Sequence, residues 1–189
     1  MIIGFHGVKG SGKDTAAQYL IDNYGFKKRA FADKLKEAVA NLFGIPLQEV
    51  DEFKTFEYYV QVEPGVTGLS WRKFLQRFGT EMGRNTFGKD FWVDQWEDSL
   101  YQIADFPNDV NIVVTDVRFQ NECHTIQRLG GVVFRITRPG HEPDGHASEK
   151  RLPDILLDGE ISNDSTIEDL HKDVEKVYQE VLEHAVRRD

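Results

Sequence analysis

Short apolar runs alternate along the chain with stretches in which apolar residues recur every three to four positions. The apolar runs predict buried strands, and they cover residues 2–6, 26–31, 111–117, 132–136 and 160–162. The stretches of helical period predict amphipathic helices, each with one buried face. Strands and helices that alternate in this order predict an α/β fold, with a mostly parallel sheet and helices on both faces.

The predicted helices cover residues 17–24, 33–42, 71–78, 91–104, 121–129 and 165–182. Several of them carry start or stop signals. Gly25 is placed to end the first helix in a left-handed conformation. Asp33 and Ser70 are predicted N-caps, because short polar side chains favour that position. Ser165 and Glu168 have the spacing of a capping box at the start of the last helix.

Three segments have no clear period. Residues 46–69 hold acidic and aromatic side chains and a Pro-Gly turn, which predicts a loop-rich insertion. Residues 79–88 predict a polar bend, and residues 138–158 predict a surface lid. We expect a single domain over 1–189, with 45–100 as a helical and loop insertion.

Composition and charge narrow the class of protein. Hydrophobic residues make up 40% of the 189 residues, enough for a core, and the single Cys123 excludes an internal disulfide. The net charge of −9 argues against binding of bulk nucleic acid, which requires a positive face. No signal peptide or apolar span is recognisable, so a cytoplasmic location is expected. The six histidines show no metal-binding spacing.

Residues 7–15, GVKGSGKDT, lie between the first predicted strand and the first predicted helix. That order is the context of a phosphate-binding loop, in which glycines permit a tight path and backbone N–H groups face the phosphates. Lys13 is then expected on the β- and γ-phosphates of ATP. Thr15, one place later than the usual hydroxyl, is expected to hold Mg²⁺ directly or through water. The alternative interpretation is an ordinary glycine turn.

Two charged residues are unusual inside such a loop. Asp14 either favours the first helical turn through the helix dipole, or faces the metal or the acceptor. Lys9 either reaches the transferring phosphate or is solvated. The predicted donor-binding residues are Gly7, Lys9, Gly10, Ser11, Gly12, Lys13, Asp14, Thr15, Arg138 and Asn163.

Asp116 and Arg138 are expected at the carboxyl ends of strands, where parallel sheets bind ligands. Asp116 is predicted to hold a magnesium-bound water or a sugar hydroxyl, with a helix N-cap as its alternative. Arg138 is predicted to clamp the transferring phosphate, with a surface arginine before a Pro-Gly turn as its alternative.

GVKGSGKDT is followed along the chain by FADKLKEAV, WRKFLQRFGTEMG, FWV, VVTDVRFQNE, ITRPGH and HASEKRLP. In this order and spacing, the segments resemble the deoxynucleoside monophosphate kinases of tailed bacteriophages, and the likeness spans nearly the whole chain. Lys9 and Asp14 fit that family's loop. Asp33-Lys34 stands where the family has Gly-Pro, and Lys73 stands for an arginine.

The resemblance implies a P-loop NTPase three-layer sandwich with an acceptor-binding insertion and a lid. It implies ATP-dependent phosphorylation of deoxynucleoside monophosphates, with Mg²⁺ as cofactor. The expected catalytic residues are Lys13, Asp116, Arg118 and Arg138. The expected substrate-binding residues are Lys36, Arg72, Gln76, Gly79, Thr80, Trp92, Asp116, Arg118 and Glu122.

Other interpretations stay open at this point. Trp92 fits a buried helical stripe as well as a nucleobase wall. The chain also fits a P-loop kinase of the phosphomevalonate or dephospho-coenzyme A type, or an ATP-binding switch module. Small-molecule nucleotides are the expected partners, and a homodimer is implied by the resemblance alone.

Overall fold

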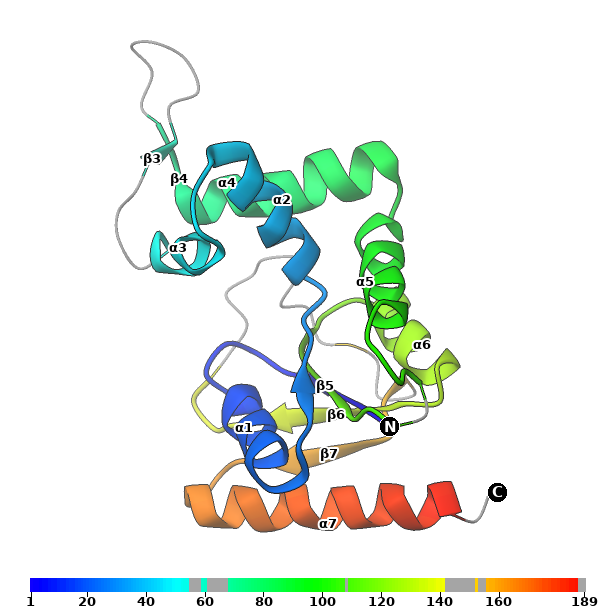
Figure 1. The fold of residues 1–189 in the computed structure, drawn as a ribbon. Coiled ribbons are helices and arrows are strands. Elements are labelled where there is room, and N and C mark those ends of the chain that lie inside the picture. Colours follow the sequence, from blue (N-terminus) through cyan, green and yellow to red (C-terminus); the bar gives the residue numbers. More distant parts are fainter. Residues whose placement is uncertain (55–58, 61–67, 108, 142–151, 153–155, 187–189) are drawn as a thin grey trace. The chain divides into compact units, whose positions relative to one another are not determined.

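The computed structural model describes residues 1–54, 59–60, 68–107, 109–141, 152 and 156–186. The predicted lid at 138–158 therefore lies largely outside the described residues. The chain divides into two compact units (Figure 1). Unit 1 consists of Met1–Ala30 and Ile103–Asp189, and unit 2 is the uninterrupted segment Phe31–Gln102.

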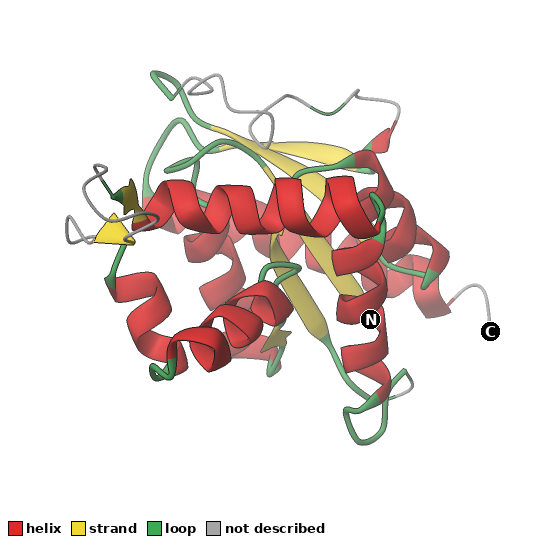
Figure 2. Ribbon diagram, turned by 90° about the horizontal axis from the view of Figure 1, so that it is seen from above, coloured by secondary structure: helices red, strands yellow, loops and turns green. Residues whose placement is uncertain are grey.

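Unit 1 is built on a five-stranded sheet in the order β2-β5-β1-β6-β7. All four strand pairings are parallel (Figures 1 and 2). The strands are β1 (Ile2–His6), β2 (Lys27–Lys28), β5 (Ile112–Val117), β6 (Val132–Thr137) and β7 (Gly159–Ser162). Every residue of the central β1 is buried, as its continuous apolar run predicts. The predicted α/β fold with a parallel sheet is thus confirmed.

Helices cover both faces of this sheet. They are α1 (Lys13–Tyr24), α6 (Gln120–Arg128) and α7 (Ile167–Val186). Ile3 and Phe5 join one core cluster with residues of α1 and α7. Gly4 lies between them and faces the opposite way, because side chains alternate along a strand. A Cβ on Gly4 would lie 2.8 Å from Ile126 Cδ1 of α6. The result is a helix–sheet–helix sandwich.

Two helix ends in unit 1 test the predicted signals. Gly25 ends α1 with a φ of 67°, as predicted. The capping box predicted for Ser165 and Glu168 is wrong by one residue, since α7 begins at Ile167. Thr166 Oγ1 accepts the N–H of Asp169 at 3.2 Å, and its hydroxyl donates to the Asp169 carboxylate at 2.9 Å. Thr166 and Asp169 have the same spacing, and they form the cap instead.

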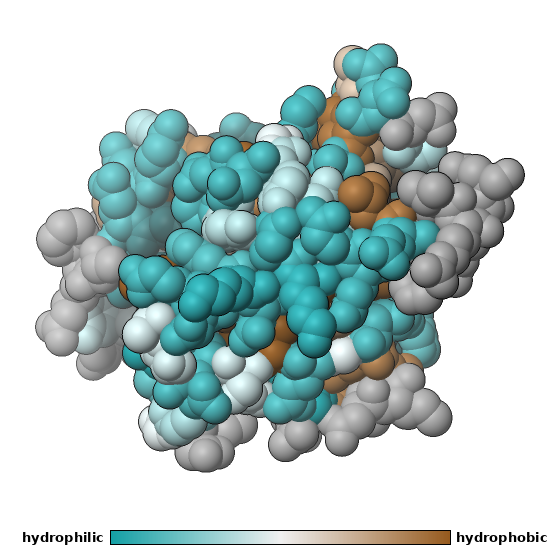
Figure 3. All heavy atoms as spheres, turned by 90° about the horizontal axis from the view of Figure 1, so that it is seen from below, coloured by the Kyte–Doolittle hydropathy of each residue, from teal (hydrophilic) through white to brown (hydrophobic). Residues whose placement is uncertain are grey.

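The side of the molecule crossed by α7 is mostly hydrophilic (Figure 3). The helix turns Leu170, Val174 and Tyr178 into the core and leaves its charged residues outside. Among the described residues, no helix is both long and apolar enough to cross a membrane.

Unit 2 is mainly helical. Its elements are α2 (Asp33–Phe43), α3 (Leu47–Glu52), β3 (Tyr59–Val60), β4 (Leu69–Ser70), α4 (Trp71–Arg77), the π-helix η1 (Phe78–Phe87) and α5 (Phe91–Tyr101). One core cluster packs around Trp71, which is 1% exposed, with Val39, Val50 and Leu75. The Trp71 indole N–H donates to Val50 O at 2.8 Å, so its polar atom is satisfied inside the core.

The predictions for unit 2 have mixed outcomes. The described part of the segment predicted as a loop-rich insertion contains α3 and the short β3–β4 pair, and its residues 55–58 and 61–67 lie outside the described residues. The bend predicted at 79–88 is the π-helix η1, a wide helix that single-sequence patterns rarely reveal. Asp33 is the first residue of α2, and Ala32 takes the N-cap position. Ser70 occupies the N-cap position of α4, as predicted, but its side chain makes no capping hydrogen bond there.

Candidate active site

The turn between β1 and α1 has the geometry that a phosphate loop requires. Gly10 and Gly12 adopt φ angles of 81° and 109°, which are strained for any residue with a Cβ. A Cβ on Gly12 would lie 2.5 Å from Asn163 Nδ2. The loop leads directly into the N-terminus of α1, where backbone N–H groups and the helix dipole favour anions.

Side chains distant in sequence hold this loop. Asn163 Nδ2 donates to Ser11 O at 2.9 Å, and Arg138 Nη1 donates to Gly10 O at 3.3 Å. Lys13 Nζ folds over the loop and donates to the carbonyls of Gly7 and Val8 at 2.7 and 2.6 Å. The structure therefore brings together the predicted donor-side residues Lys13, Arg138 and Asn163.

Asp14 points out of the loop. Its carboxylate is 79% exposed and lies 2.6 Å from Nζ of Lys28 on β2. Such an exposed pair contributes about 0–1 kcal/mol to stability. Thr15, the next residue, is half-buried in the first turn of α1, and Lys9 is exposed. The sequence does not predict the Lys28 contact, because only the folded sheet brings β2 next to the start of α1.

The end of β5 positions the next group of candidates. Asp116 lies inside β5, and α6 begins at Gln120 with Phe119 at its N-cap position. The alternative interpretation of Asp116 as a helix N-cap is therefore wrong. Glu122 is 5% exposed, and its Oε2 accepts the N–H groups of Arg118 and Phe119 at 2.7 and 3.0 Å. The Glu122 carboxylate thus fixes the backbone that carries the exposed Arg118.

Unit 2 carries the remaining predicted substrate-binding residues. Arg72 and Gln76 are one turn apart on α4, and Thr80 follows on η1. Lys36 Nζ lies 2.7 Å from the Asp51 carboxylate. Burial alone would raise the pKa of Asp51, but hydrogen bonds from Lys36 and Lys54 lower it below its ordinary value. Asp51 therefore stays charged, and its ion pair links Lys36 in the first turn of α2 to the last turn of α3.

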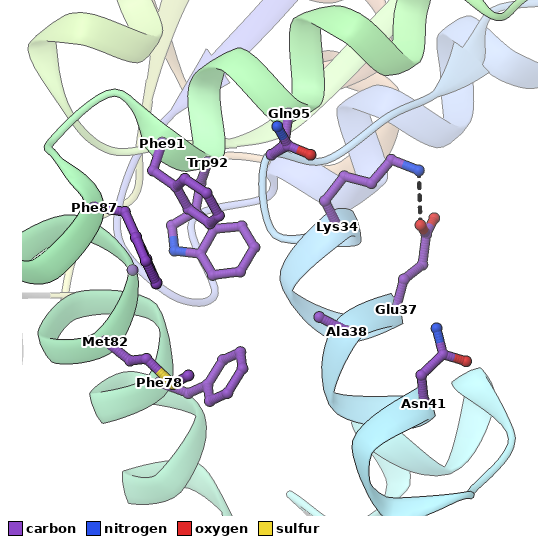
Figure 4. Close-up of a pocket in the computed structure, with 11 residues that line it drawn as sticks. Lys34, Glu37, Ala38, Asn41, Phe78, Met82, Phe87, Phe91, Trp92 and Gln95 are labelled. Carbon is purple, nitrogen blue, oxygen red and sulfur yellow. Dashed lines mark hydrogen bonds and ion pairs between the residues drawn. The ribbon is translucent and has the colours of Figure 1, made fainter.

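Trp92 belongs to the wall of a pocket in unit 2 (Figure 4). The pocket encloses about 360 Å³, within the range of small-molecule sites. The Trp92 ring is fixed by its indole N–H, which donates to Gly79 O at 2.9 Å. One wall is aromatic and the other is polar, and these walls carry Phe78, Phe87, Phe91 and Trp92, facing Lys34, Glu37 and Asn41.

The polar wall of this pocket contains an ion pair, with Lys34 Nζ 2.7 Å from Glu37 Oε2. On the aromatic side, the Phe91 ring centroid lies 4.8 Å from that of Trp92 and 5.0 Å from that of Phe87. Sequence patterns identify Trp92 but do not predict that Phe87 lines the same pocket, because Phe87 belongs to η1, whose wide period differs from that of an α-helix.

Among the described residues, no group of three or more His, Cys, Asp or Glu side chains forms a metal site. Cys123 is buried in α6, and its thiol donates to Leu156 O at 2.8 Å. Burial, followed by the nearby charges of Asp158 and Glu122, raises the pKa of the Cys123 thiol to about 11. A thiol that keeps its proton is a poor nucleophile and a poor metal ligand.

A parallel sheet with a phosphate loop between its central strand and the first helix defines an α/β protein with the P-loop fold. A dephospho-CoA kinase from Campylobacter jejuni shares this fold, with a TM-score of 0.51 and 15% sequence identity over 95% of this chain and 96% of that chain. Residues 52–174 match the family described as deoxynucleotide monophosphate kinase, and the chain belongs to this family.

Individual relatives agree with this result. A protein of Acanthamoeba polyphaga mimivirus that carries the provisional name deoxynucleotide monophosphate kinase is 34% identical over 183 residues, which cover 92% of this chain and 94% of the relative. The deoxynucleotide monophosphate kinase of Enterobacteria phage T4 is 24% identical, over 89% of this chain and 95% of the relative. The predicted family, P-loop fold and phosphotransferase class are confirmed.

Proposed function

We propose that this protein transfers the γ-phosphate of ATP to the 5′-phosphate of a deoxynucleoside monophosphate. The observation that carries the proposal is the phosphate loop, with its glycines in the left-handed region and Lys13 folded over it. Arg138 and Asn163 donate hydrogen bonds to carbonyls of this loop. Phosphoryl transfer requires positioning and charge stabilisation more than covalent chemistry, and this set of groups supplies both. The nucleotide specificity follows from membership of the family.

The donor binds at the phosphate loop. Backbone N–H groups of residues 7–15 surround the β-phosphate, and Lys13 releases its carbonyl contacts to bind the β- and γ-phosphates. Arg138 lies beside Gly10 and stabilises the charge that develops on the transferring phosphoryl group. Asn163 holds the loop through Ser11 O and borders the donor base.

Thr15 and Asp116 fit a magnesium ion, since hydroxyl and carboxylate oxygens are its preferred ligands. β5, which carries Asp116, pairs directly with β1, which leads into the phosphate loop. We assign Thr15 and Asp116 as the side chains that hold Mg²⁺, directly or through water. When bound, the ion would neutralise charge on the donor phosphates.

The acceptor phosphate requires cations of its own. We assign this role to Arg118, Arg72 and Lys36, because an arginine can present two parallel donors to one phosphate. Gln76, Gly79 and Thr80 then contact the acceptor along α4 and η1. The pocket at Trp92 takes the nucleobase, which stacks on its aromatic wall. Glu122 acts through the backbone of Arg118. A homodimer stays a prediction.

The test is a diphosphate-formation assay with ATP, Mg²⁺ and each deoxynucleoside and ribonucleoside monophosphate in turn. We expect turnover of at least one deoxynucleoside monophosphate. Phosphomevalonate and dephospho-coenzyme A serve as control acceptors, and neither is expected to be phosphorylated. Hydrolysis of ATP without turnover of any nucleoside monophosphate would refute the proposal.

A further inference from the structure

His6 is a buried titratable residue that none of the roles above uses. It is the last residue of β1, immediately before the phosphate loop, and is 5% exposed. Two backbone groups of unit 1 meet its ring. Val117 O lies 2.9 Å from Nδ1, and the N–H of Leu152 donates to Nε2 at 3.3 Å.

These two contacts define the protonation state of the imidazole. A backbone N–H can only donate, so Nε2 must be an unprotonated acceptor. The proton then sits on Nδ1, from which it is donated to Val117 O. The neutral Nδ1–H tautomer is therefore the one form of His6 that satisfies both contacts.

The surroundings of His6 also favour the neutral ring. Burial lowers the pKa of His6 below its ordinary value, and the cations Arg135, Lys13 and Arg118 lower it further. The hydrogen bond to Val117 acts in the opposite direction but does not reverse the shift. A neutral ring can both donate and accept, as the two contacts require.

His6 bridges a break in the pairing of β1 and β5. Gly4 of β1 pairs with Val114 of β5, and His6 of β1 pairs with Val117 of β5. The two positions are two residues apart on β1 but three residues apart on β5. β5 thus carries one extra residue, a bulge that disrupts the backbone ladder and re-aims nearby side chains. Beyond this bulge, the His6 side chain fastens the end of β5 to the end of β1. Val117 lies between Asp116 and Arg118.

Leu152 is held by the same region. It is 5% exposed, and its carbonyl accepts a hydrogen bond from Nη2 of Arg135. Arg135 lies on β6, is 3% exposed and pairs with Glu160 of β7 at 3.4 Å. The backbone of Leu152 is therefore bonded to side chains from two neighbouring strands. Its N–H donates to His6 of β1, and its carbonyl accepts from Arg135 of β6.

We propose that His6 is a positioning residue for the acceptor side of the reaction, acting as the neutral Nδ1–H tautomer. It fixes Val117, and through it the adjacent Arg118, relative to the phosphate loop. The inference rests on the proposed function, which places Arg118 on the acceptor phosphate. A shift of Arg118 away from the loop would weaken acceptor use and leave donor binding at Lys13 nearly unchanged.

The tautomer can be measured without any activity assay. In protein labelled with ¹⁵N-histidine, the ring nitrogen shifts distinguish Nδ1–H from Nε2–H, and a His6→Asn variant identifies the His6 signals. We expect Nδ1–H for His6 at neutral pH, with exchange of this proton slowed by burial. An Nε2–H tautomer would overturn the proposal, whatever the enzyme assays give.

Two variants separate the two contacts of His6. In His6→Asn, the new amide nitrogen reaches about as far as Nδ1 of the histidine and can still donate to Val117 O. In His6→Gln, the longer side chain reaches about as far as Nε2 and can accept from Leu152, but it loses the Val117 bond. Both variants remove the same ring, so lost packing affects them alike.

We expect His6→Gln to lower kcat/KM for the deoxynucleoside monophosphate about tenfold, and to leave KM for ATP within about twofold. We expect His6→Asn to restore acceptor use to within about threefold of the wild type. Equal loss of donor and acceptor use in both variants would indicate a merely structural role and overturn the proposal. Equal acceptor kinetics in the two variants would also overturn it.

Failure of the proposed function gives a different pattern. In that case the wild type itself turns over no deoxynucleoside monophosphate, and the acceptor role of His6 falls with it even if the Nδ1–H tautomer is present. If the wild type is active and the tautomer is Nε2–H, the proposed function stands and only the role of His6 is overturned.

Discussion

Replacement of Gly83 by alanine tests whether the tight contact between η1 and Trp92 shapes the pocket of unit 2. Gly83 is buried in η1, and a Cβ at this position would overlap Trp92 Nε1 and lie 2.7 Å from Cε2. The indole cannot simply rotate away, because its N–H is bonded to Gly79 O at 2.9 Å. Either the ring moves and loses this hydrogen bond, or η1 shifts.

The magnitude follows from three effects. Replacing glycine by alanine in a helix interior stabilises the helix by about 1 kcal/mol. Overpacking costs about 1–3 kcal/mol, and a lost hydrogen bond to a half-buried group costs about 1 kcal/mol. We therefore expect Gly83→Ala to lower the free energy of unfolding by about 2 kcal/mol. For a chain of this length, that lowers Tm by about 4–8 °C.

Gly79→Ala is the matched control in the same π-helix. A Cβ at Gly79 would meet only Cδ1 of Leu35 at 2.7 Å, the far end of a flexible side chain. We expect this variant to be about as stable as the wild type, or up to about 1 kcal/mol more stable. Thermal unfolding followed by far-ultraviolet circular dichroism measures both variants. Equal Tm values for Gly83→Ala and Gly79→Ala would refute the reasoning.

Three further predictions concern single side chains. Lys13→Ala abolishes phosphoryl transfer and leaves the circular dichroism spectrum unchanged, because the lost charge serves the donor phosphates; turnover near the wild-type rate would contradict this role. Arg118→Ala raises KM for the acceptor by about tenfold or more and barely changes KM for ATP; an equal rise in both values would count against the assignment. Cys123, with its pKa raised to about 11, is about 0.1% thiolate at pH 8, so iodoacetamide should label it only after denaturation, as mass spectrometry can show. Rapid labelling of the folded protein would contradict its burial.

The elements that follow from local sequence were predictable. The apolar run of residues 2–6 is β1, and the loop after it has its signature within nine consecutive residues. Arg138 was also identified, because the carboxyl ends of parallel strands meet at one edge of the sheet. Asn163 was named for a different reason, as part of a loop that could hold the donor adenine or cap the last helix. The inferences for β1, the phosphate loop and Arg138 need only the hydrophobic pattern of the sequence, the loop motif and the topology of a parallel sheet.

The features that sequence patterns missed depend on contacts between distant residues. In η1, Gly79 lies against Leu35 and Gly83 lies against Trp92, and no local sequence pattern predicts these neighbours. The bulge in β5 is visible only in its pairing with β1. His6 reads as an ordinary strand residue until Val117 and Leu152 are seen to meet its ring.

The division of the chain has an optical consequence. All three tryptophans, Trp71, Trp92 and Trp96, belong to unit 2, whereas unit 1 contains Tyr19, Tyr24 and Tyr178 but no tryptophan. Light that excites tryptophan selectively therefore produces emission from unit 2 alone. The tryptophans are thus intrinsic fluorophores of the segment proposed to bind the nucleobase. Unfolding of unit 2, or binding of a ligand in its pocket, can be followed by their emission without any attached dye.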